Sequence, residues 1–409
     1  MRILSFAEGA SVRKGGVGLV GVPWIAKSLA DRGHQIVLNV GGRVSPGGER
    51  FVCADLERAI RQPSGAGTFG VVAYPAYGAW AWAPRMNWRL RAHVREADFI
   101  TLHSLYSFPV LAGYLLARSC GKPYGLWPHG VLAPFQRRIS AAKKGAYGLA
   151  VGRRILDHAS VLFYSSPTER NEAADLGLRN PSVVLPHGFD FREYSSLPPR
   201  GLFRDKYLQG RVGPLIVFLS RLNAKKGLDV LLQAFRGVLQ EMPSALLAIV
   251  GAGDPPSFEG QVKRWVTEHG VGGRVFMPGL LTGEEKLKVF ADADVFVLPS
   301  QTENFGFAVF EAMASSVAVV VSEGIHYADD IRRYEAGLVV PCGVETFATA
   351  ILKLVKGPVL RKEMGDNGRR LSQNYSWEKS AEQYEQCICS VLEGDRVSAN
   401  LSPGRMPRG

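Results

Sequence analysis

Short runs of apolar residues alternate along this chain with segments in which apolar residues recur every three or four positions. Ile3 to Phe6 opens the series, and Val295 to Leu298 is a later run of the same kind, bounded by turn residues. Such runs are typical of buried strands, whereas a spacing of three or four positions predicts helices. The repeated alternation therefore predicts an α/β fold with parallel sheets.

The most informative strand-to-helix passage is SQTENFGFAVFEAMASS, which follows the run 295–298 directly. Val309, Phe310 and Met313 recur at helical spacing, so we expect a helix over 307–314. A turn bearing Gly306 precedes it. The first turn of a helix offers free backbone N–H groups and the positive end of the helix dipole, and both favour phosphate oxygens. This turn is therefore a candidate phosphate site.

Two carboxylates bracket that turn. Glu303 lies on the loop, and Glu311 follows eight positions later, about two turns into the helix by helical geometry. The pair can flank one ligand that has an anionic middle and hydroxyl groups at its ends, which describes a nucleotide sugar. The alternative is that both carboxylates are solvated surface groups, as charged residues usually are.

A second charged loop follows the apolar run in PLIVFLSRLNAKKGLDV. Arg221 and Lys226 lie on one short loop after a predicted parallel strand, near a helix start. Two cations placed in this way can neutralise a diphosphate leaving group as its charge develops. The alternative is a solvated turn. The neighbouring Lys225 also leaves open which of the two lysines takes this position.

The length of 409 residues and a hydrophobic content of 46% favour two domains. The net charge of +12 is uneven, since residues 1–200 hold 25 Lys and Arg against 13 Asp and Glu, and the remainder holds 24 against 24. Such a basic half favours an anionic membrane surface. Nucleic acid is the weaker alternative, because no recognisable nucleic-acid module accompanies the charge.

The segment VVAYPAYGAWAWAPRMNWRLRAHVRE combines aromatic and basic residues. Amphipathic rings favour the depth of lipid headgroups and arginines pair with phosphates, so the segment predicts an interfacial surface or a wall on which a sugar stacks. Packing of the rings in a core remains the alternative. The aromatic residues are Tyr74, Tyr77, Trp80, Trp82 and Trp88, and the arginines are Arg85, Arg89, Arg91 and Arg95.

Two histidines stand where a predicted strand passes into a loop. His103 ends the strand ADFITLH, and His129 follows PYGLWP. Clefts of open α/β sheets form at the carboxyl ends of the strands, so both side chains are candidates for a cleft, although a single histidine is more often structural. A basic stretch follows His129, and either a solvated helix face or contact with an acceptor phosphate or a membrane explains it. Its residues include Arg137, Arg138, Lys143 and Lys144.

Near the start of the chain, a Gly-rich turn with Gly15, Gly16 and Gly18 leads into a predicted helix. It lacks the spaced glycine pattern and the acidic residue at the end of the second strand that a nicotinamide site requires, which argues against a dehydrogenase. The five cysteines show no metal-ligand spacing, and no signal peptide precedes the first strand, so we expect a reducing cytosol.

Taken together, SQTENFGFAVFEAMA, with its Glu-x7-Glu spacing, and the Arg-x4-Lys-Gly loop resemble retaining glycosyltransferase family 4. The resemblance implies the GT-B fold: two Rossmann-like domains that face each other across a cleft, with a C-terminal helix crossing back to the first. We expect an acceptor domain over 1–195, a donor domain over 196–375, the returning helix over 376–393 with Trp377, Tyr384 and Leu392 apolar, and a disordered tail over 394–409.

The resemblance also assigns roles. Glu303 would hold sugar hydroxyls, Glu311 the ribose, and His129 the sugar near the acceptor, while His187 replaces the family's usual Asn and receives no catalytic role. Catalytic candidates are therefore Glu303, His129, Arg221 and Lys226. Donor-binding candidates are Gly15, Gly16, Arg221, Lys226, Gly251, Met277, Leu280, Glu303, Asn304, Phe305, Gly306, Phe307 and Glu311, and acceptor-binding candidates are His103, Arg137, Arg138, Lys143 and Lys144.

The implied function is transfer of a hexosyl unit, with retention, from a UDP- or GDP-sugar to a glycan or lipid-linked acceptor in cell-envelope polysaccharide synthesis. No Asp-x-Asp metal motif is apparent, so we expect neither metal nor cofactor. We expect a cytoplasmic protein in peripheral contact with the inner face of an anionic membrane, and no nucleic-acid partner. The alternatives are a phosphorylase or sugar-nucleotide epimerase on the same fold, and a non-catalytic protein that binds nucleotide sugars.

Overall fold

The computed structural model describes residues 1–8, 17–43, 66–78, 80–138 and 147–395, and it divides into two compact units. Unit 1 comprises Met1–Gly188 and the chain from Trp377 onward, and unit 2 comprises Phe189–Ser376. The boundary falls at Gly188, before the position expected from the sequence. Each unit has a single described sheet in which every strand pair is parallel, so the predicted α/β class is confirmed.

The sheet of unit 1 has the strand order β3-β2-β1-β4-β5-β6-β7. Its strands are β1 Arg2–Glu8, β2 Gln35–Arg43, β3 Thr68–Ala76, β4 Phe99–His103, β5 Tyr124–Trp127, β6 Val161–Tyr164 and β7 Ser182–Val184. Its helices are α1 Val17–Asp31, α3 Arg91–Glu96, α4 Phe108–Cys120, α5 Pro134–Arg138, α7 Arg153–Asp157, α8 Pro167–Glu172 and α17 Trp377–Glu393.

The sheet of unit 2 has the order β10-β9-β8-β11-β12-β13. Its strands are β8 Leu215–Leu219, β9 Leu246–Val250, β10 Val275–Gly279, β11 Val295–Leu298, β12 Ala318–Ser322 and β13 Gly337–Val340. Its helices are α9 Leu202–Tyr207, α10 Leu228–Glu241, α11 Phe258–Glu268, α12 Gly283–Asp292, α13 Phe307–Ala314, α14 Ala328–Arg333, α15 Val344–Lys356 and α16 Pro358–Ser372.

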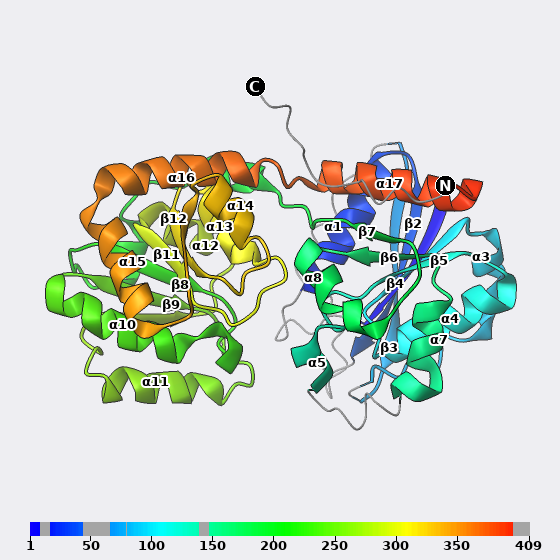
Figure 1. Cartoon of the computed structure of the whole chain (residues 1–409), viewed down its shortest axis with the longest axis horizontal. Helices are drawn as coiled ribbons and strands as arrows, with labels where there is room; N and C mark the ends of the chain where they lie inside the picture. The colour runs from blue at the N-terminus through cyan, green and yellow to red at the C-terminus, as the bar shows by residue number, and fades with distance from the viewer. Residues whose placement is uncertain (9–16, 44–65, 79, 139–146, 396–409) are drawn as a thin grey trace. The chain divides into compact units, whose positions relative to one another are not determined.

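Helices cover both faces of the unit 2 sheet, with α10, α11 and α15 on one face and α12, α13, α14 and α16 on the other (Figure 1). A strand covered on both faces can be apolar at every position, which explains why the run 295–298 shows no alternation. All four residues of β11 are buried. The bounds predicted for this strand and for the helix that follows it match β11 and α13.

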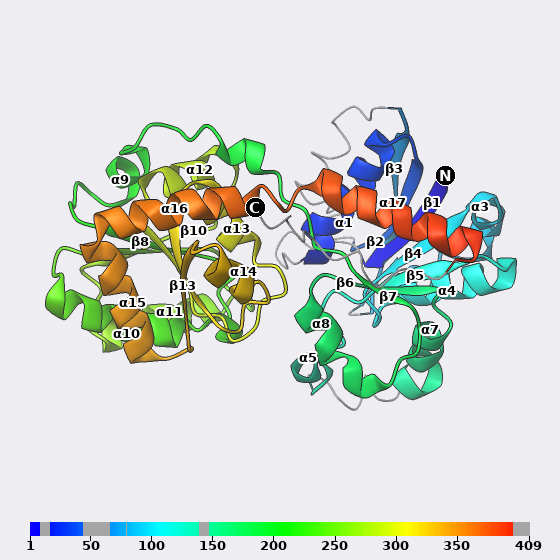
Figure 2. The same cartoon turned by 45° about the horizontal axis from the view of Figure 1, so that its top comes forward.

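Helix α17 returns to unit 1 and lies beside α1 (Figures 1 and 2). Trp377 and Tyr384 are buried on this helix, the Tyr384 hydroxyl hydrogen-bonds to Thr101, and Glu385 forms an ion pair with Arg32. The predicted crossing of the last helix to the first domain is therefore confirmed. Leu392, which we expected on the apolar face, is 40% exposed, because it lies in the last turn of the helix.

The segment 194–213, which contains Pro198 and Pro199, belongs to unit 2. The Asp292 carboxylate is fully buried and accepts hydrogen bonds from the backbone N–H groups of Phe203 and Arg204, at 3.0 and 2.9 Å. These are free donors in the first turn of α9, so the carboxylate caps that helix from the end of α12. The segment is therefore anchored to unit 2.

No helix in the described ranges is long and apolar enough to cross a membrane. Among the same residues, no group of three or more His, Cys, Asp or Glu side chains is arranged to hold a metal ion.

Candidate functional site

The strand order of unit 2 reverses between β8 and β11, which lie side by side with Val295 next to Ile216. In open parallel sheets, the loops at the carboxyl ends of two such strands diverge to opposite faces and leave a crevice that binds ligands. The loop after β8 carries Arg221 and Lys226, and the loop after β11 carries Glu303. The sequence candidates of unit 2 therefore meet at the expected ligand position.

The two loops are fastened together through their backbones. The N–H group of Gln301 donates to the carbonyl oxygen of Lys225 at 2.8 Å. Gly227, which follows the 3₁₀ turn Ala224–Lys226, has φ +66°, and a Cβ atom there would lie 2.1 Å from the carbonyl oxygen of Pro299. Only glycine allows both this conformation and this approach. The close contact fixes where Lys226 enters the site.

Lys226 and Glu303 form an ion pair across the loops, with side chains only 5% and 15% exposed. Burial raises the pKa of Glu303, but the ammonium of Lys226, with Lys225 and Arg221 nearby, outweighs this effect and holds the pKa below its ordinary value. The Glu303 carboxylate is therefore ionised at neutral pH. Charges this deeply buried need a partner, so removal of either one leaves the other uncompensated.

Two further ion pairs involve the remaining charged candidates of this site. Arg221 binds Asp254 at 2.7 Å, and Glu311 binds Lys286 at 2.8 Å. Lys286 also lies over the ring of Tyr194, 5.4 Å from its centroid. The sequence did not identify Asp254 or Lys286, because each lies on a different βα segment from its partner and only the fold brings the pairs together.

The start of α13 presents backbone more than side chains. Gly306 has φ +74° and precedes the helix, and no side chain caps its first turn. The ring of Phe305 is fully buried and stacks on Phe310 with centroids 4.2 Å apart, so Phe305 is a core residue whose side chain does not reach a ligand. Only the backbone amides of the 304–307 stretch suit the predicted role.

His326 also belongs to this site, although no sequence pattern pointed to it. Its backbone N–H donates to the carbonyl oxygen of Glu303 at 3.0 Å. Burial lowers the pKa of His326 to about 4, although the Glu303 carboxylate acts in the opposite direction. The imidazole is therefore neutral at physiological pH beside an ionised carboxylate.

Gly251 and Leu280 directly follow the carboxyl ends of β9 and β10, and Met277 lies within β10. The Gly251 N–H donates to the carbonyl oxygen of Gly279 at 2.9 Å, which joins the two strand ends. Met277 is half-buried and Leu280 is exposed. These residues thus share the carboxyl edge of the sheet with the charged loops.

In unit 1, the residues at the carboxyl ends of the strands form a stack of rings instead of ion pairs. His103 Nδ1 lies 3.0 Å from His129 Nε2, and the ring of Trp127 stacks on His129 at 5.2 Å and on His187 at 5.0 Å. Burial lowers the pKa of His103 and His187 to about 3 and that of His129 well below its ordinary value. All three imidazoles are therefore neutral at physiological pH.

The conformation of the His129 loop is held by a buried carboxylate. His129 and Gly130 both have positive φ, at +53° and +80°. Glu169 on α8 accepts hydrogen bonds from the N–H groups of Gly130 and Ser165. Burial raises the pKa of Glu169. The sequence predicted neither this anchor nor the position of His187 in the stack.

Of the predicted acceptor residues, Arg137 and Arg138 end α5, where Arg137 forms an ion pair with Asp175. Gly15, Gly16, Lys143 and Lys144 lie outside the described residues.

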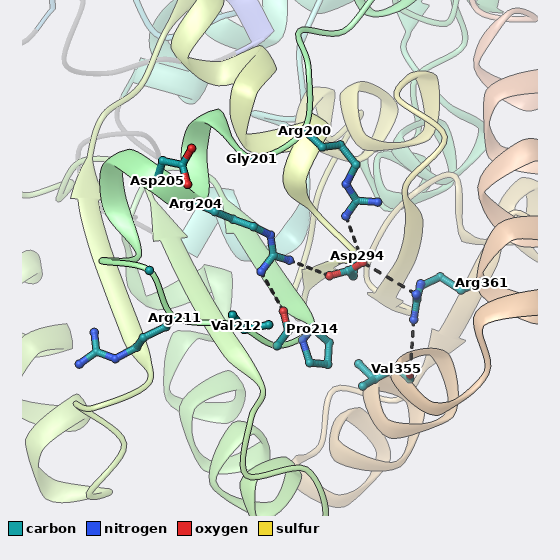
Figure 3. Close-up of a pocket in the computed structure, with 12 residues that line it drawn as sticks. Arg200, Gly201, Arg204, Asp205, Arg211, Val212, Pro214, Asp294, Val355 and Arg361 are labelled. Atoms are coloured by element: carbon teal, nitrogen blue, oxygen red, sulfur yellow. Dashed lines mark hydrogen bonds and ion pairs between the residues drawn. The ribbon is translucent and has the colours of Figure 1, made fainter.

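A pocket of about 600 Å³ lies at the opposite edge of the unit 2 sheet, where β8 and β11 begin. Figure 3 shows Arg200, Arg204 and Arg361 converging on Asp294, whereas Arg211 points away from it. Arg200, Arg204 and Arg361 lie 3.3, 3.0 and 3.8 Å from this carboxylate. They also donate to backbone carbonyl groups, including that of Gly213. Because the guanidinium groups are engaged within the protein, we interpret this cluster as structural.

These features define a class. Two parallel Rossmann-like units with a returning C-terminal helix constitute the GT-B fold of glycosyltransferases. The fold is that of solved structures including HepE from Anabaena in complex with UDP and glucose, with a TM-score of 0.75 at 18% identity over 95% of this chain and 100% of that one. WaaG, a glycosyltransferase involved in lipopolysaccharide biosynthesis, gives a TM-score of 0.66 at 17% identity, covering 95% and 99% of the two chains.

Sequence comparison identifies the family. The model of glycosyl transferases group 1 matches residues 202–371, and that of the glycosyl transferase 4-like domain matches residues 15–188. A GDP-mannose-dependent α-(1-6)-phosphatidylinositol monomannoside mannosyltransferase from Mycolicibacterium smegmatis is 30% identical over 61% of this chain and 71% of its own. A phosphatidyl-myo-inositol mannosyltransferase from Mycobacterium leprae is 27% identical over 74% and 76%. This chain belongs to the group 1 glycosyltransferases, of the family 4-like type.

Proposed function

We propose that this protein is a retaining hexosyltransferase that uses a nucleoside diphosphate sugar and glycosylates a lipid-linked or glycan acceptor of the cell envelope. The observation that carries the proposal is the Lys226–Glu303 ion pair, buried at the switch point of unit 2 between Arg221 and the start of α13. Two cations, the backbone amides at the start of α13 and one carboxylate supply what a diphosphate and a sugar require.

In this proposal, the donor diphosphate lies against Lys226, Arg221 and the amides of residues 304–307. These groups stabilise the negative charge that develops as the bond between the sugar and the phosphate breaks. When the donor is bound, its phosphate also contacts the ammonium group of Lys226. The Glu303 carboxylate then accepts hydrogen bonds from sugar hydroxyls. Glu311, held by Lys286 at 2.8 Å, binds the ribose. Gly251, Met277 and Leu280 contact the base.

The acceptor hydroxyl attacks the anomeric carbon on the same face of the sugar from which the leaving group departs. The new carbon–oxygen bond forms as the bond to the phosphate oxygen breaks, a phosphate oxygen of the donor takes the acceptor proton, and the nucleoside diphosphate leaves. Configuration is thereby retained. His129 positions the sugar as a neutral hydrogen-bonding group, consistent with its lowered pKa. The two cations take the part that a divalent metal plays in other transferases, so we propose a metal-independent reaction.

Relatives named as GDP-mannose-dependent support GDP-mannose as the first donor to test, and their phosphatidylinositol acceptors support a lipid-linked acceptor. We place the reaction in the cytoplasm, at the inner face of the plasma membrane. The excess of basic residues in 1–200 supports this location.

The test is calorimetric titration of the whole chain with GDP, UDP and ADP, with GDP-mannose, and with the corresponding glucose conjugates. We expect one nucleotide to bind, and Lys226→Ala to abolish that binding. Lys206→Ala is the matched control, because Lys206 also pairs with a glutamate in unit 2, at 3.0 Å, but on an exposed surface. Equal binding by both variants would refute the site.

Two further readouts test the mechanism. Proton NMR of the first product gives the anomeric configuration, and an inverted product would refute retention. Turnover after dialysis against EDTA tests whether Arg221 and Lys226 take the place of a divalent metal ion. Loss of activity that Mg²⁺ or Mn²⁺ restores would contradict a metal-independent reaction.

A further inference from the structure

The chain between β3 and α3 places its small residues inside and its large aromatic rings outside. Ala81, Ala83 and Met86 are almost fully buried, whereas Trp82 is 51% and Trp88 75% exposed. Tyr77 and Trp80 are exposed as well. We call these four aromatic residues, Tyr77, Trp80, Trp82 and Trp88, the tryptophan surface. Packing in a core, which the sequence left open, does not occur for these rings.

The exposure of tryptophan is confined to this segment. The chain has seven tryptophans, of which Trp24, Trp127 and Trp377 are buried and Trp265 is half-buried. Full burial of a large apolar side chain stabilises a fold by about 1.5–3 kcal/mol relative to exposure. Three indoles left outside within one short stretch therefore indicate a surface that another molecule covers.

The backbone holds the tryptophan surface in a fixed conformation. Tyr77 and Trp82 exchange N–H to carbonyl hydrogen bonds in both directions, each 2.9 Å long. The carbonyl group of Trp80 accepts a hydrogen bond from the Phe108 N–H at 2.9 Å, and the two rings meet edge to face. The fold therefore holds these rings at the surface before any partner binds.

Four arginines share the segment with the rings, and all four are exposed: Arg85, Arg89, Arg91 and Arg95. Within the described residues, no carboxylate lies within ion-pair distance of any of them, and Arg91 donates only to a carbonyl group, that of Ser119. A partner that covers this surface must therefore accept aromatic rings and supply negative charge. Indoles favour the headgroup region of a bilayer, and guanidinium groups pair with phosphates.

We propose that the tryptophan surface and its four arginines dock unit 1 on an anionic phospholipid membrane. A wall for sugar stacking, the other interpretation, gives no role to the four exposed arginines. Docking is independent of the donor site. It is connected to the proposed function because a surface-bound enzyme meets a lipid-linked acceptor within the plane of the membrane.

The experiment is cosedimentation of the full chain with vesicles of phosphatidylcholine containing phosphatidylglycerol, and with vesicles of phosphatidylcholine alone, at low and high salt. We expect binding only to the anionic vesicles, weakened by salt as screened charge interactions are. Trp82→Ala with Trp88→Ala should lower the partition coefficient about tenfold. Arg85→Glu with Arg89→Glu should abolish the preference for phosphatidylglycerol.

The matched control is Val212→Ala with Val359→Ala, which truncates two exposed apolar side chains of unit 2. It should bind vesicles as the parent chain does. No binding of the parent chain to anionic vesicles, or equal binding by the tryptophan variant, would overturn the proposal. Calorimetry with the nucleotide separates the two proposals, since the tryptophan variant should bind donor normally, and loss of donor binding in Lys226→Ala should leave vesicle binding intact.

Discussion

The two units both carry their candidate residues at the carboxyl edge of a parallel sheet, and they fill that edge with opposite chemistry. At the carboxyl ends of β8 and β11, unit 2 places ion pairs, of which Lys226 with Glu303 is the most deeply buried. At the carboxyl ends of β4 and β5, unit 1 places neutral stacked rings, including His103 and His129. A parallel sheet therefore fixes where a ligand can bind, and the side chains fix what kind of ligand it is.

The difference follows from what each edge has to stabilise. A diphosphate brings about two negative charges, which only cations and amide dipoles offset inside a protein. A sugar hydroxyl brings no charge, and neutral imidazoles can donate to it or accept from it. The comparison predicts that removal of charge disables unit 2, whereas removal of a ring in unit 1 has a smaller effect.

The largest effect should come from Lys226→Met. We expect turnover with the nucleotide sugar to fall by two orders of magnitude or more, because a preorganised charge contact with the leaving group is lost. The variant should also lose stability, since Glu303 is left buried without its cation. Adding Glu303→Gln should restore the melting temperature without restoring turnover. Steady-state kinetics and thermal melts of both variants check this.

Asp294→Asn is the control for that experiment. This carboxylate accepts the Leu215 N–H at 2.8 Å and lies among three arginines, at the edge of the sheet away from the proposed donor site. We expect a loss of about 2 kcal/mol in the free energy of unfolding and unchanged turnover per folded molecule. A hundredfold loss of turnover here would remove the distinction between the functional and the structural ion pairs.

Glu311→Ala should lower kcat/KM about a hundredfold, because the ribose loses a charged hydrogen-bond acceptor and Lys286 loses its partner. Glu323→Ala is the matched variant, since Glu323 also pairs with a cation of unit 2, Arg332, at 2.7 Å, but on an exposed surface. Kinetics with saturating acceptor and varied donor measure the loss. Equal kinetics for the two variants would exclude Glu311 from the donor site.

The sequence predicted most of the fold because its signals are local. The apolar run of β11, the helical spacing of α13 and the glycine between them lie within one stretch, so their bounds could be stated before the structure was known. The cations on the β8 loop and Glu303 were also assigned from local context, and the strand order then brought Lys226 and Glu303 into contact.

The rest depends on contacts between distant segments. Asp254 and Lys286 pair with the predicted residues only after β9 and α12 have packed, and His187 joins Trp127 only because β5 and the end of β7 approach each other. The burial of Ala81 and Ala83 under exposed tryptophans reverses the usual preference of large apolar residues for the interior. No pattern within the segment predicts that its small residues are buried and its large rings exposed.

In unit 1, His103→Ala should lower kcat about tenfold and leave the donor KM unchanged. His103 acts through His129, because the 3.0 Å contact between their ring nitrogens couples the tautomer of one ring to that of the other. His129→Ala should cost more, and the double variant should be no worse than His129→Ala alone, which is the signature of one residue acting through another. Additive losses, or a stability loss that accounts for the whole effect, would refute the positioning role.

The smallest effect concerns pH and stability. Burial holds the pKa of His187 at about 3, so the folded state keeps this ring neutral while the unfolded chain takes up a proton near pH 6.5. The unfolded state therefore binds more protons between these values, and stability decreases as the pH falls below 6.5.

His187→Phe keeps a ring against Trp127 and removes the titration. We expect it to reduce the loss of unfolding free energy between pH 7 and pH 5 by about 2 kcal/mol, measured by urea denaturation at each pH. His93→Phe, which replaces an exposed histidine, is the matched control. If the two variants shift the pH dependence equally, the stacked ring is not the group that senses acid, and the neutral character assigned to the unit 1 edge would have to be revised.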